Sequence, residues 1–419
     1  MPKTRSKYNV IHFMPDRKVI IVVLCGSLTL FISMGIRQSF GLFLQPISLD
    51  LGFGRETFSL AIAFQSLIFG LPLMGIAADR FGSRRIVAVG ALLYAASLWG
   101  LSAITHPLGL YLILGLLMGI ALSGVSNVVI LGAVGQVVSP EKRSSYFGLV
   151  GSLSSFGTVV IVPISQWLLS QFAWRISFMI LAVSAGVILL LSIGYPGPPK
   201  SSIRPSENQD PDAQTFTQIL SFARHHSGYL LLNAGFFVCG FHVTFIATHL
   251  PAYLADQGIR PMVSASVLSV LGLFNILGSL FFGFLGDRYR KKHLLSILYF
   301  SRAIVISLFL VLPLSEISAL IFGGAIGFLW LATVPLTSGT IAQIFGSRYL
   351  STLYGIVFFS HQLGSFMGVW LGGRLYDTTG SYTAVWIIAI ALGVMASLVH
   401  LPIGDRPLNF AQKPATSSA

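Results

Sequence analysis

Few charged or titratable side chains lie inside the apolar stretches of this chain, and none of them is acidic. Arg37, His242, His249, Arg302 and His361 fall within such stretches, whereas all 13 Asp and Glu residues fall in tails, in loops or at the ends of stretches. An unpaired charge in hydrocarbon costs about 2.5–3.5 kcal/mol on insertion scales, so a cation there needs a partner. The absence of a buried carboxylate argues against a cation exporter and against proton symport through an acid. The natural partner of a mid-membrane Arg is therefore an anion.

Arg37 is the first candidate for binding such an anion. Its guanidinium is planar and matches a carboxylate through two parallel hydrogen bonds. The alternative is that Arg37 extends its charge toward the membrane surface or pairs with backbone carbonyls.

The elements that position these residues are predicted to be membrane-spanning helices. Hydrophobic residues make up 54% of the 419 residues and charged residues only 9%, against roughly 25% charged in soluble domains. Twelve stretches are long enough to cross about 30 Å of hydrocarbon as helices. The chain is therefore predicted to be an all-α membrane protein with six spans in each half. The stretches are 19–46, 57–78, 86–104, 108–137, 146–169, 176–195, 229–254, 263–285, 294–312, 317–344, 353–373 and 383–401.

The two halves are predicted to be internal repeats. The segment GIAADRFGSRR from Gly75 resembles GFLGDRYRKKH from Gly283, about half the chain later. The segments GIRQSF and GFHVTF also align, which sets Arg37 opposite His242. Two homologous halves predict a binding site at the axis that they share.

His242 is therefore expected to face the same space as Arg37. Imidazole titrates near neutrality, so His242 and His249, about two helical turns apart on one face, are predicted to carry a coupled proton. The alternative is that each His only forms hydrogen bonds between helices. Other polar residues complete the predicted substrate-binding set with Arg37 and His242: Gln38, Asn127, Asn275, Thr333 and His361.

The pattern G-x-x-x-D-R-x-G-x-[RK]-[RK] after the second stretch, repeated after the eighth, resembles the signature loop of the major facilitator superfamily. Within that superfamily, the segment from Gly35 to Ser59 resembles the monocarboxylate transporter and oxalate–formate exchanger branches. The resemblance implies two pseudo-symmetric six-helix bundles that rock about a central cavity lined by helices 1, 4, 7 and 10. It also implies that Arg302, in helix 9, is structural.

The chain departs from the animal monocarboxylate pattern at the residues that couple protons in that family. Its helix-8 Asp and Arg fall on Asn275 and Ser279 here, and its helix-1 Lys falls on Gln38. Those coupling roles are therefore not carried over.

The resemblance gives the repeated loop a gating role. Asp79 is expected to accept hydrogen bonds from helix-terminal amides or from an Arg of the facing bundle, which would latch the cytoplasmic ends in the outward-open state. Asp287 would act in the same way in the second half. The alternative is that these charges only fix the topology. The predicted gating residues are Gly75, Asp79, Arg80, Gly82, Arg84, Arg85, Gly283, Asp287 and Arg288.

The Lys and Arg residues predict the orientation in the membrane. Of the 26, two lie within spans and four lie on the side predicted to be outside: Arg55, Arg175, Arg260 and Arg374. All the others lie with the two termini, which places both termini in the cytoplasm. The net charge of +13 is thus assigned to topology and to anionic lipid headgroups, and no nucleic-acid partner is expected. The short tails fit a bacterial inner membrane.

The leading functional hypothesis is a secondary active transporter of a small organic anion, a mono- or dicarboxylate, driven by protons or by exchange. The alternatives are an efflux carrier for a drug, siderophore or other metabolite, and a non-transporting membrane sensor. No enzymatic activity, cofactor, metal or obligate protein partner is expected, because there is no Walker A loop and Cys25 and Cys239 have no partner pattern.

The predicted organisation follows the spans. A cytoplasmic arm (1–18) precedes the first bundle (19–195), and a polar, Pro-rich cytoplasmic linker (196–224) leads to the second bundle (225–402) and a cytoplasmic tail (403–419).

Overall fold

The computed structural model of the chain describes residues 16–71, 73–139, 142–197, 216–346 and 350–407. Ten helices in this part of the chain are long and apolar enough to cross a membrane, and α3 (Arg55–Phe69) with α4 (Leu73–Phe81) makes an eleventh if the two are counted as one bent span. The remaining predicted stretch, 353–373, lies in the 30-residue helix α17 (Leu350–Thr379). The predicted all-α membrane fold is confirmed.

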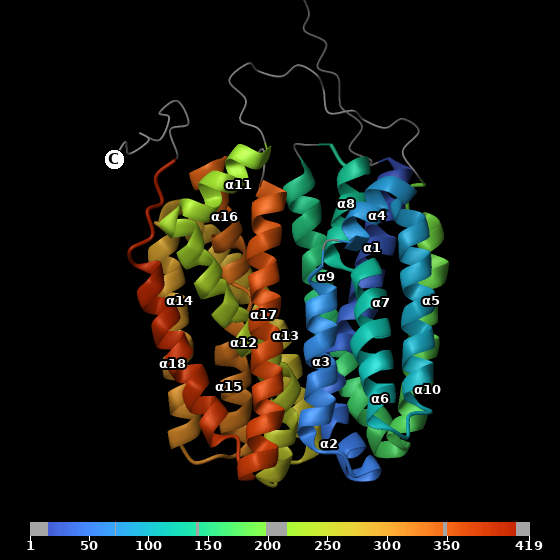
Figure 1. Cartoon of the computed structure of the whole chain (residues 1–419). Helices are drawn as coiled ribbons and strands as arrows, with labels where there is room; N and C mark the ends of the chain where they lie inside the picture. The colour runs from blue at the N-terminus through green and yellow to red at the C-terminus, as the bar shows by residue number, and fades with distance from the viewer. Residues whose placement is uncertain (1–15, 72, 140–141, 198–215, 347–349, 408–419) are drawn as a thin grey trace, which may run out of the picture.

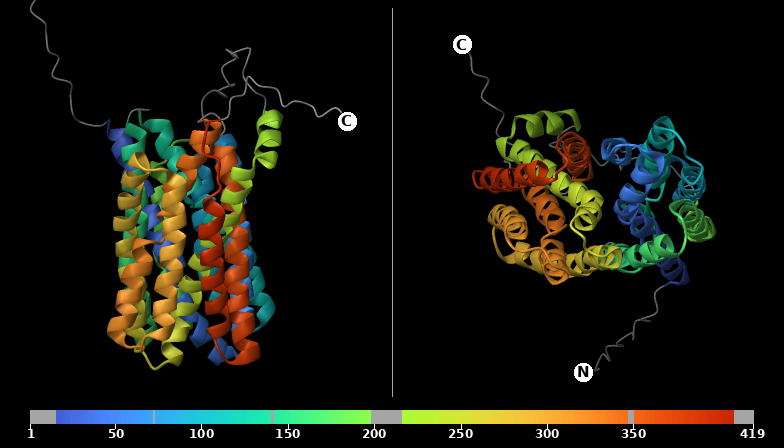
Figure 2. Two further views of the ribbon diagram at one scale, coloured as in Figure 1. Left: turned by 90° about the vertical axis from the view of Figure 1, so that its left-hand side faces the viewer. Right: turned by 90° about the horizontal axis from the view of Figure 1, so that it is seen from below.

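The helices form two bundles that stand side by side, as the view along the helices shows (Figure 2). Besides α3 and α4, the first bundle contains α1 (Arg17–Gln38), α2 (Phe40–Leu51), α5 (Ser83–Leu101), α6 (Pro107–Leu110), a π-helical stretch (Tyr111–Leu117), α7 (Met118–Gly124), α8 (Asn127–Val137), α9 (Arg143–Gln171) and α10 (Trp174–Leu191). Besides α17, the second bundle contains α11 (Phe216–His225), α12 (Ser227–Asp256), α13 (Pro261–Arg288), α14 (Lys291–Val311), α15 (Glu316–Phe328), α16 (Thr333–Phe345) and α18 (Thr383–His400).

The two ends of the bundles differ. We call the end at which α1 begins and α18 ends the terminal side, at the top of Figure 1, and the end that holds Gly52–Gly54 between α2 and α3 the distal side. Most residues of the predicted N-terminal arm, linker and tail lie outside the described residues, so the boundaries of these three segments stay predictions.

Several predicted spans are interrupted rather than continuous. The stretch 19–46 divides into α1 and α2 at Ser39, whose hydroxyl donates to the Ile36 carbonyl oxygen at 2.7 Å. A Ser hydroxyl that bonds locally offers the backbone an alternative to the helical ladder. The stretches 108–137 and 317–344 are broken near their middles, at Val125–Ser126 and at 329–332. These breaks fall at roughly equivalent places in the two repeats, and backbone groups beside them, such as the carbonyls of Leu329 and Trp330, take side chains as hydrogen-bond partners.

Small residues allow the helices to approach closely. A side chain at Gly364 or Gly368 of α17 would collide with the backbone carbonyl of Phe237 or Phe241 in α12. Between the bundles, α3 packs along α17 and α9 packs along α13. Backbones that approach this closely need small residues at the crossing point.

The turn in the repeated loop differs between the two halves. Gly82 precedes α5 with a φ of 85°, which side-chain-bearing residues rarely adopt, so glycine is required there. The equivalent Arg290 precedes α14 with a φ of −64° and needs no glycine. Its guanidinium binds Asp405 beyond the end of α18, with the shorter hydrogen bond at 2.6 Å.

Candidate functional site

Arg37 lies at the end of α1, close to the middle of the bundle, and is half-buried. No described residue forms an ion pair or a hydrogen bond with its guanidinium. Its Cζ atom lies 4.6 Å from the centroid of the Phe69 ring at the end of α3, a cation–π distance. The face of a benzene ring offers only weak electrostatic compensation, so most hydrogen-bonding capacity of Arg37 remains free for another group.

Aromatic rings from both bundles continue from Phe69. The Phe69 ring meets Phe358 of α17 edge to face at 6.2 Å, and Phe358 stacks on the His361 ring at 5.8 Å with an interplanar angle of 10°. Tyr354 lies one turn away on α17 and stacks on Phe358, and Phe236 of α12 lies behind His361. We call Phe69, Phe236, Tyr354, Phe358 and His361 the aromatic cluster. Two of the predicted residues, Arg37 and His361, are thus linked through the Phe69 and Phe358 rings and do not contact each other directly.

The neutral candidates Gln38, Asn127 and Thr333 differ in burial. Gln38 is half-buried beside Arg37. Asn127 and Thr333 are the first residues of α8 and α16, directly after the two helix breaks. Asn127 is exposed, whereas Thr333 is fully buried with its Oγ1 atom 3.2 Å from the Cys239 sulfur.

Asn275 connects three elements rather than facing an open space. Its amide nitrogen donates to the Ser155 hydroxyl of α9, in the other bundle, at 3.1 Å. Its carbonyl oxygen accepts from the backbone N–H of Leu331, in the break between α15 and α16, at 3.0 Å, and from Ser279 at 3.4 Å. The side chain is 6% exposed, so all its polar atoms are already used.

The same helix break is also held by Arg302, which the resemblance implied to be structural. Arg302 is 1% exposed and donates to the carbonyl oxygens of Leu329 and Trp330. Carbonyls at the end of a helix lack intrahelical partners and carry partial negative charge, which a guanidinium satisfies.

His242 is held against α18. Its Nε2 atom lies 2.8 Å from the Ala389 carbonyl oxygen, and its Nδ1 atom is buried without a hydrogen-bond partner among the described residues. The side chain is 1% exposed. The structure does not bring His242 to Arg37, although the repeat alignment places them opposite each other.

His249 belongs to a polar network that closes the distal side. Its Nδ1 atom lies 3.0 Å from the Tyr382 hydroxyl, and its Nε2 atom lies 2.8 Å from the Val369 carbonyl and 3.3 Å from the Ser59 hydroxyl of the other bundle. His249 thus joins α12, α17, α18 and α3.

Arg55 is the centre of this distal network, and the sequence analysis did not single it out. Its guanidinium donates two hydrogen bonds of 2.7 Å to Asp256 of the other bundle and one of 3.0 Å to Tyr382. Its Cζ atom also lies 3.7 Å from the centroid of the Tyr376 ring. Asp377 accepts from the backbone N–H groups of Arg55 and Glu56 at 2.9 and 2.8 Å, so one bundle caps the first turn of a helix in the other. We call Arg55, Asp256, Asp377 and Tyr382 the distal lock.

A charge balance could have revealed the lock. All four Arg residues assigned to the distal side form ion pairs: Arg55 with Asp256, Arg175 with Asp50, Arg260 with Glu316 and Arg374 with Glu56. Two of these pairs, Arg55–Asp256 and Arg374–Glu56, cross between the bundles. Near-equal numbers of both charges at one end of a membrane protein indicate pairing, whereas an excess of one sign does not.

The terminal side has no such lock in the part of the chain that the structure describes. No ion pair or side-chain hydrogen bond between described residues joins the two bundles there. Asp79, Arg80, Arg84 and Arg85 of the first repeated loop are exposed, as are Asp287 and Arg288 of the second. Neither Asp forms a hydrogen bond or ion pair with a described residue.

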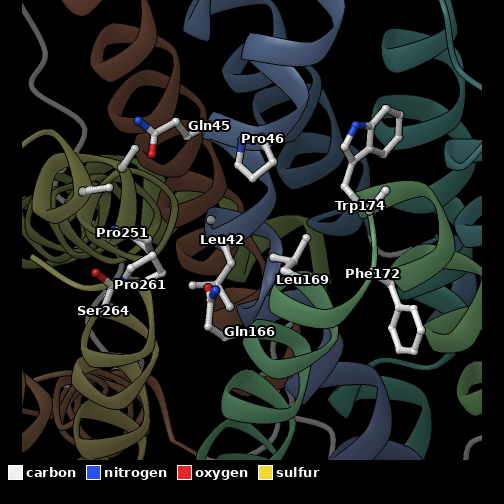
Figure 3. A pocket seen from close by; sticks show the side chains of 14 residues that line it. Leu42, Gln45, Pro46, Gln166, Leu169, Phe172, Trp174, Pro251, Pro261 and Ser264 are labelled. Carbon is white, nitrogen blue, oxygen red and sulfur yellow. The ribbon is translucent and has the colours of Figure 1, made fainter.

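A cavity of about 300 Å³ lies between the bundles at the distal side (Figure 3). It is lined mainly by apolar residues of α2, α9 and α12 and by the starts of α10 and α13, with Gln45, Gln166 and Ser264 as its polar side chains. Arg37 does not line it. No group of three or more His, Cys, Asp or Glu side chains suited to a metal ion occurs among the described residues.

Several relatives of this chain are named as transporters. Monocarboxylate transporter 13 of Rattus norvegicus is 28% identical over 91% of this chain and 89% of its own length. Monocarboxylate transporter 12 of the same organism is 28% identical over 78% of this chain and 73% of its own length. An uncharacterized transporter of the major facilitator type from Bacillus subtilis is 27% identical over 88% of this chain and 91% of its own length.

Solved structures show the same fold. A nucleoside transporter superposes with a TM-score of 0.74 at 14% identity, over 91% of this chain and 99% of its own. A xylose transporter from E. coli in an inward-open conformation superposes with a TM-score of 0.71 at 14% identity, over 92% and 96%.

The model of the Major Facilitator Superfamily matches residues 26–368 and, in a second match, 232–417. This coverage agrees with the helical bundles and with the transporters named above, none of which is an enzyme. The chain belongs to the major facilitator superfamily.

Proposed function

We propose that this membrane transporter carries a small organic anion, a mono- or dicarboxylate, by alternating access. The observation that supports this most is Arg37, a mid-membrane cation with no carboxylate and no hydrogen-bond partner among the described residues. A bound carboxylate would supply the missing charge and accept two of its N–H groups. The names of the monocarboxylate transporter relatives support the same class of substrate.

We propose further that the described conformation opens toward the terminal side. The distal lock and the Arg374–Glu56 pair hold the bundles together at the other end. The excess of Lys and Arg on the terminal side supports its placement in the cytoplasm, which makes this state inward-facing. The bundles would then correspond to residues 19–195 and 225–402, joined by the linker 196–224.

The repeated loops fit the same proposal. In an inward-facing state, Asp79 and Asp287 would be released from the facing bundle, in agreement with their exposure and with their lack of a hydrogen bond or ion pair to any described residue. In the outward-facing state each would latch a helix end. The nine gating residues of the two loops would therefore act in the outward-facing state.

Proton coupling, if it accompanies transport, is best supported at His249. This ring contacts both bundles within the distal network, so a change of its protonation would act on the closure of that side. The partner-free Nδ1 of His242 gives the second position at which a proton could be accepted. Exchange of one anion for another needs neither residue to titrate.

The test is uptake into liposomes that contain the purified full-length protein. A panel of radiolabelled mono- and dicarboxylates would be compared with and without an inward-acid gradient, for wild type, Arg37→Ala and the matched control Arg175→Ala, which removes a distal arginine. Saturable uptake that Arg37→Ala abolishes and Arg175→Ala retains is expected. Uptake that is insensitive to Arg37, or absent for every carboxylate, would overturn the anion proposal and favour efflux of a neutral metabolite.

A further inference from the structure

We propose that the substrate is an aromatic monocarboxylate without an amino group, whose carboxylate binds Arg37 and whose ring packs against Phe69 and Phe358. This inference rests on the proposed anion transport and names the class of anion. The inference follows from the aromatic side chains near the Arg37 guanidinium and from the lack, among the described residues, of a carboxylate or a second free cation beside it.

The ring-binding surface is formed by the part of the aromatic cluster that is not fully packed. Phe69, Tyr354 and Phe358 are partly exposed, whereas Phe236 and His361 behind them are 1% and 7% exposed. The parallel stack of Phe358 on His361 fixes the orientation of Phe358 from behind. Exposed ring surface that is supported by a buried second layer is preformed for another ring, because little side-chain entropy is lost on binding.

The surface also spans the two bundles. Phe69 belongs to α3 and Phe358 to α17, and their edge-to-face contact at 6.2 Å is made across the interface. Aromatic pairs prefer such edge-to-face or offset arrangements. A substrate ring bound here would contact both bundles at once, so its binding energy would depend on their relative position. Alternating access requires a ligand with this property.

The charges restrict what the ring can carry. Arg37 provides one positive charge, and no carboxylate lies at the middle of a span where it could bind an ammonium group. Arg302, the other arginine within the spans, already donates to the carbonyl oxygens of Leu329 and Trp330, so no second free arginine serves a dicarboxylate there among the described residues. An aromatic amino acid would therefore leave its ammonium group unpaired, and a dicarboxylate would leave one carboxylate unpaired.

The test is competition binding on the purified full-length protein, with radiolabelled benzoate as the probe. Unlabelled benzoate, cyclohexanecarboxylate, acetate and phenylalanine would compete. The first two acids have rings of similar size, but only benzoate has an aromatic face. Benzoate is expected to bind about 10-fold more tightly than cyclohexanecarboxylate, a ratio typical of one aromatic contact, with acetate and phenylalanine weaker still.

Two variants test whether Phe358 makes the aromatic contact with the bound ring. Phe358→Leu is expected to weaken benzoate binding about 10-fold and to leave acetate binding unchanged. Phe359→Leu is the matched control, because this neighbouring ring is 36% exposed and is absent from the aromatic cluster. If Phe358→Leu does not fold, Phe69→Leu and the wild-type competition series still decide the question.

The outcomes separate this inference from the proposed function. Equal affinity for benzoate, cyclohexanecarboxylate and acetate, all lost in Arg37→Ala, would overturn the aromatic class and retain anion transport. Tight binding of phenylalanine would also overturn the class, since it would show that an ammonium group is accommodated. Failure of every carboxylate to bind would overturn both proposals.

Discussion

The distal lock allows a quantitative prediction about conformation. Asp256→Asn removes the negative charge and one of the two acceptors that bind Arg55 at 2.7 Å. The two side chains are 9% and 20% exposed, so the pair lies between a surface pair, worth about 0–1 kcal/mol, and a buried pair, which costs about 3–5 kcal/mol to break. We expect the distal-closed state to lose about 2 kcal/mol relative to the open state, because Arg55 keeps its contacts with Tyr376 and Tyr382.

A loss of about 2 kcal/mol changes the equilibrium between the two states about 30-fold. If the open state is about 1% populated in the wild type, it should rise to about a quarter in Asp256→Asn. The assay is double electron–electron resonance between spin labels at Leu49→Cys and Ile317→Cys, in a background without Cys25 and Cys239. Both label sites are exposed, at 76% and 71%, and lie on different bundles at the distal side.

The matched control is Glu316→Gln, which breaks the Arg260–Glu316 ion pair on the same side but within one bundle. A second, longer distance between the labels should appear in Asp256→Asn and not in Glu316→Gln. Because position 317 adjoins the changed residue, the control carries its second label at Val311→Cys instead of Ile317→Cys. Identical distance distributions for Asp256→Asn and wild type would refute the assignment of Arg55 and Asp256 as a lock. So would an equal change in Glu316→Gln.

Three further predictions concern stability. Gly364→Val should lower the unfolding free energy by about 1–3 kcal/mol through overpacking. Gly355→Ala is the control, because its new methyl group would contact no other atom and should leave the unfolding free energy unchanged. Thermal unfolding of both variants tests this prediction. Arg302→Met should cost about 2–4 kcal/mol, because two buried carbonyls lose their donor, and an unchanged melting temperature would contradict this. Arg290 lowers the pKa of the Asp405 carboxyl by hydrogen bonding. The ionised Asp405 therefore stabilises the docked segment at pH values above its unfolded pKa of about 3.9. This stabilisation is lost as the pH falls through the lower pKa of the folded state. The protection of residues 401–407 against hydrogen exchange, relative to the intrinsic rate at each pH, should fall below about pH 4 in wild type, whereas in Asp405→Asn it should be low at all pH values.

The membrane fold could be predicted from the sequence because hydrophobic length determines spans directly. The duplication was visible because Gly75 and Gly283 open the same motif in the two halves. The helix breaks at Val125–Ser126 and at 329–332 were not predicted. The residues at 329–332 are as apolar as the rest of their span, whereas Ser123, Ser126 and Asn127 gave a polar signal at the first break that was not interpreted as a break. Hydrophobicity indicates which residues lie in the membrane, but it carries no information about which backbone hydrogen bonds form.

The site was predictable only in part. Arg37 could be identified because a cation within a span is rare and its possible partners can be counted. The direction in which the His242 side chain points could not be predicted, because α12 is buried around most of its circumference and has no polar face that would indicate its orientation. The Arg55–Asp256 pair joins residues 201 positions apart in the chain. Such a pair follows from how the bundles dock and leaves no local pattern.

The most direct measurement of the central claim is labelling of Gln38→Cys, beside Arg37, in a background without Cys25 and Cys239. A membrane-impermeant maleimide would be applied to each side of oriented vesicles, with and without a carboxylate. We predict faster labelling from the terminal side, protection by the carboxylate, and loss of that protection when Arg37→Ala is added. Labelling from the distal side alone, or protection that persists without Arg37, would contradict an anion site at Arg37 that opens toward the terminal side.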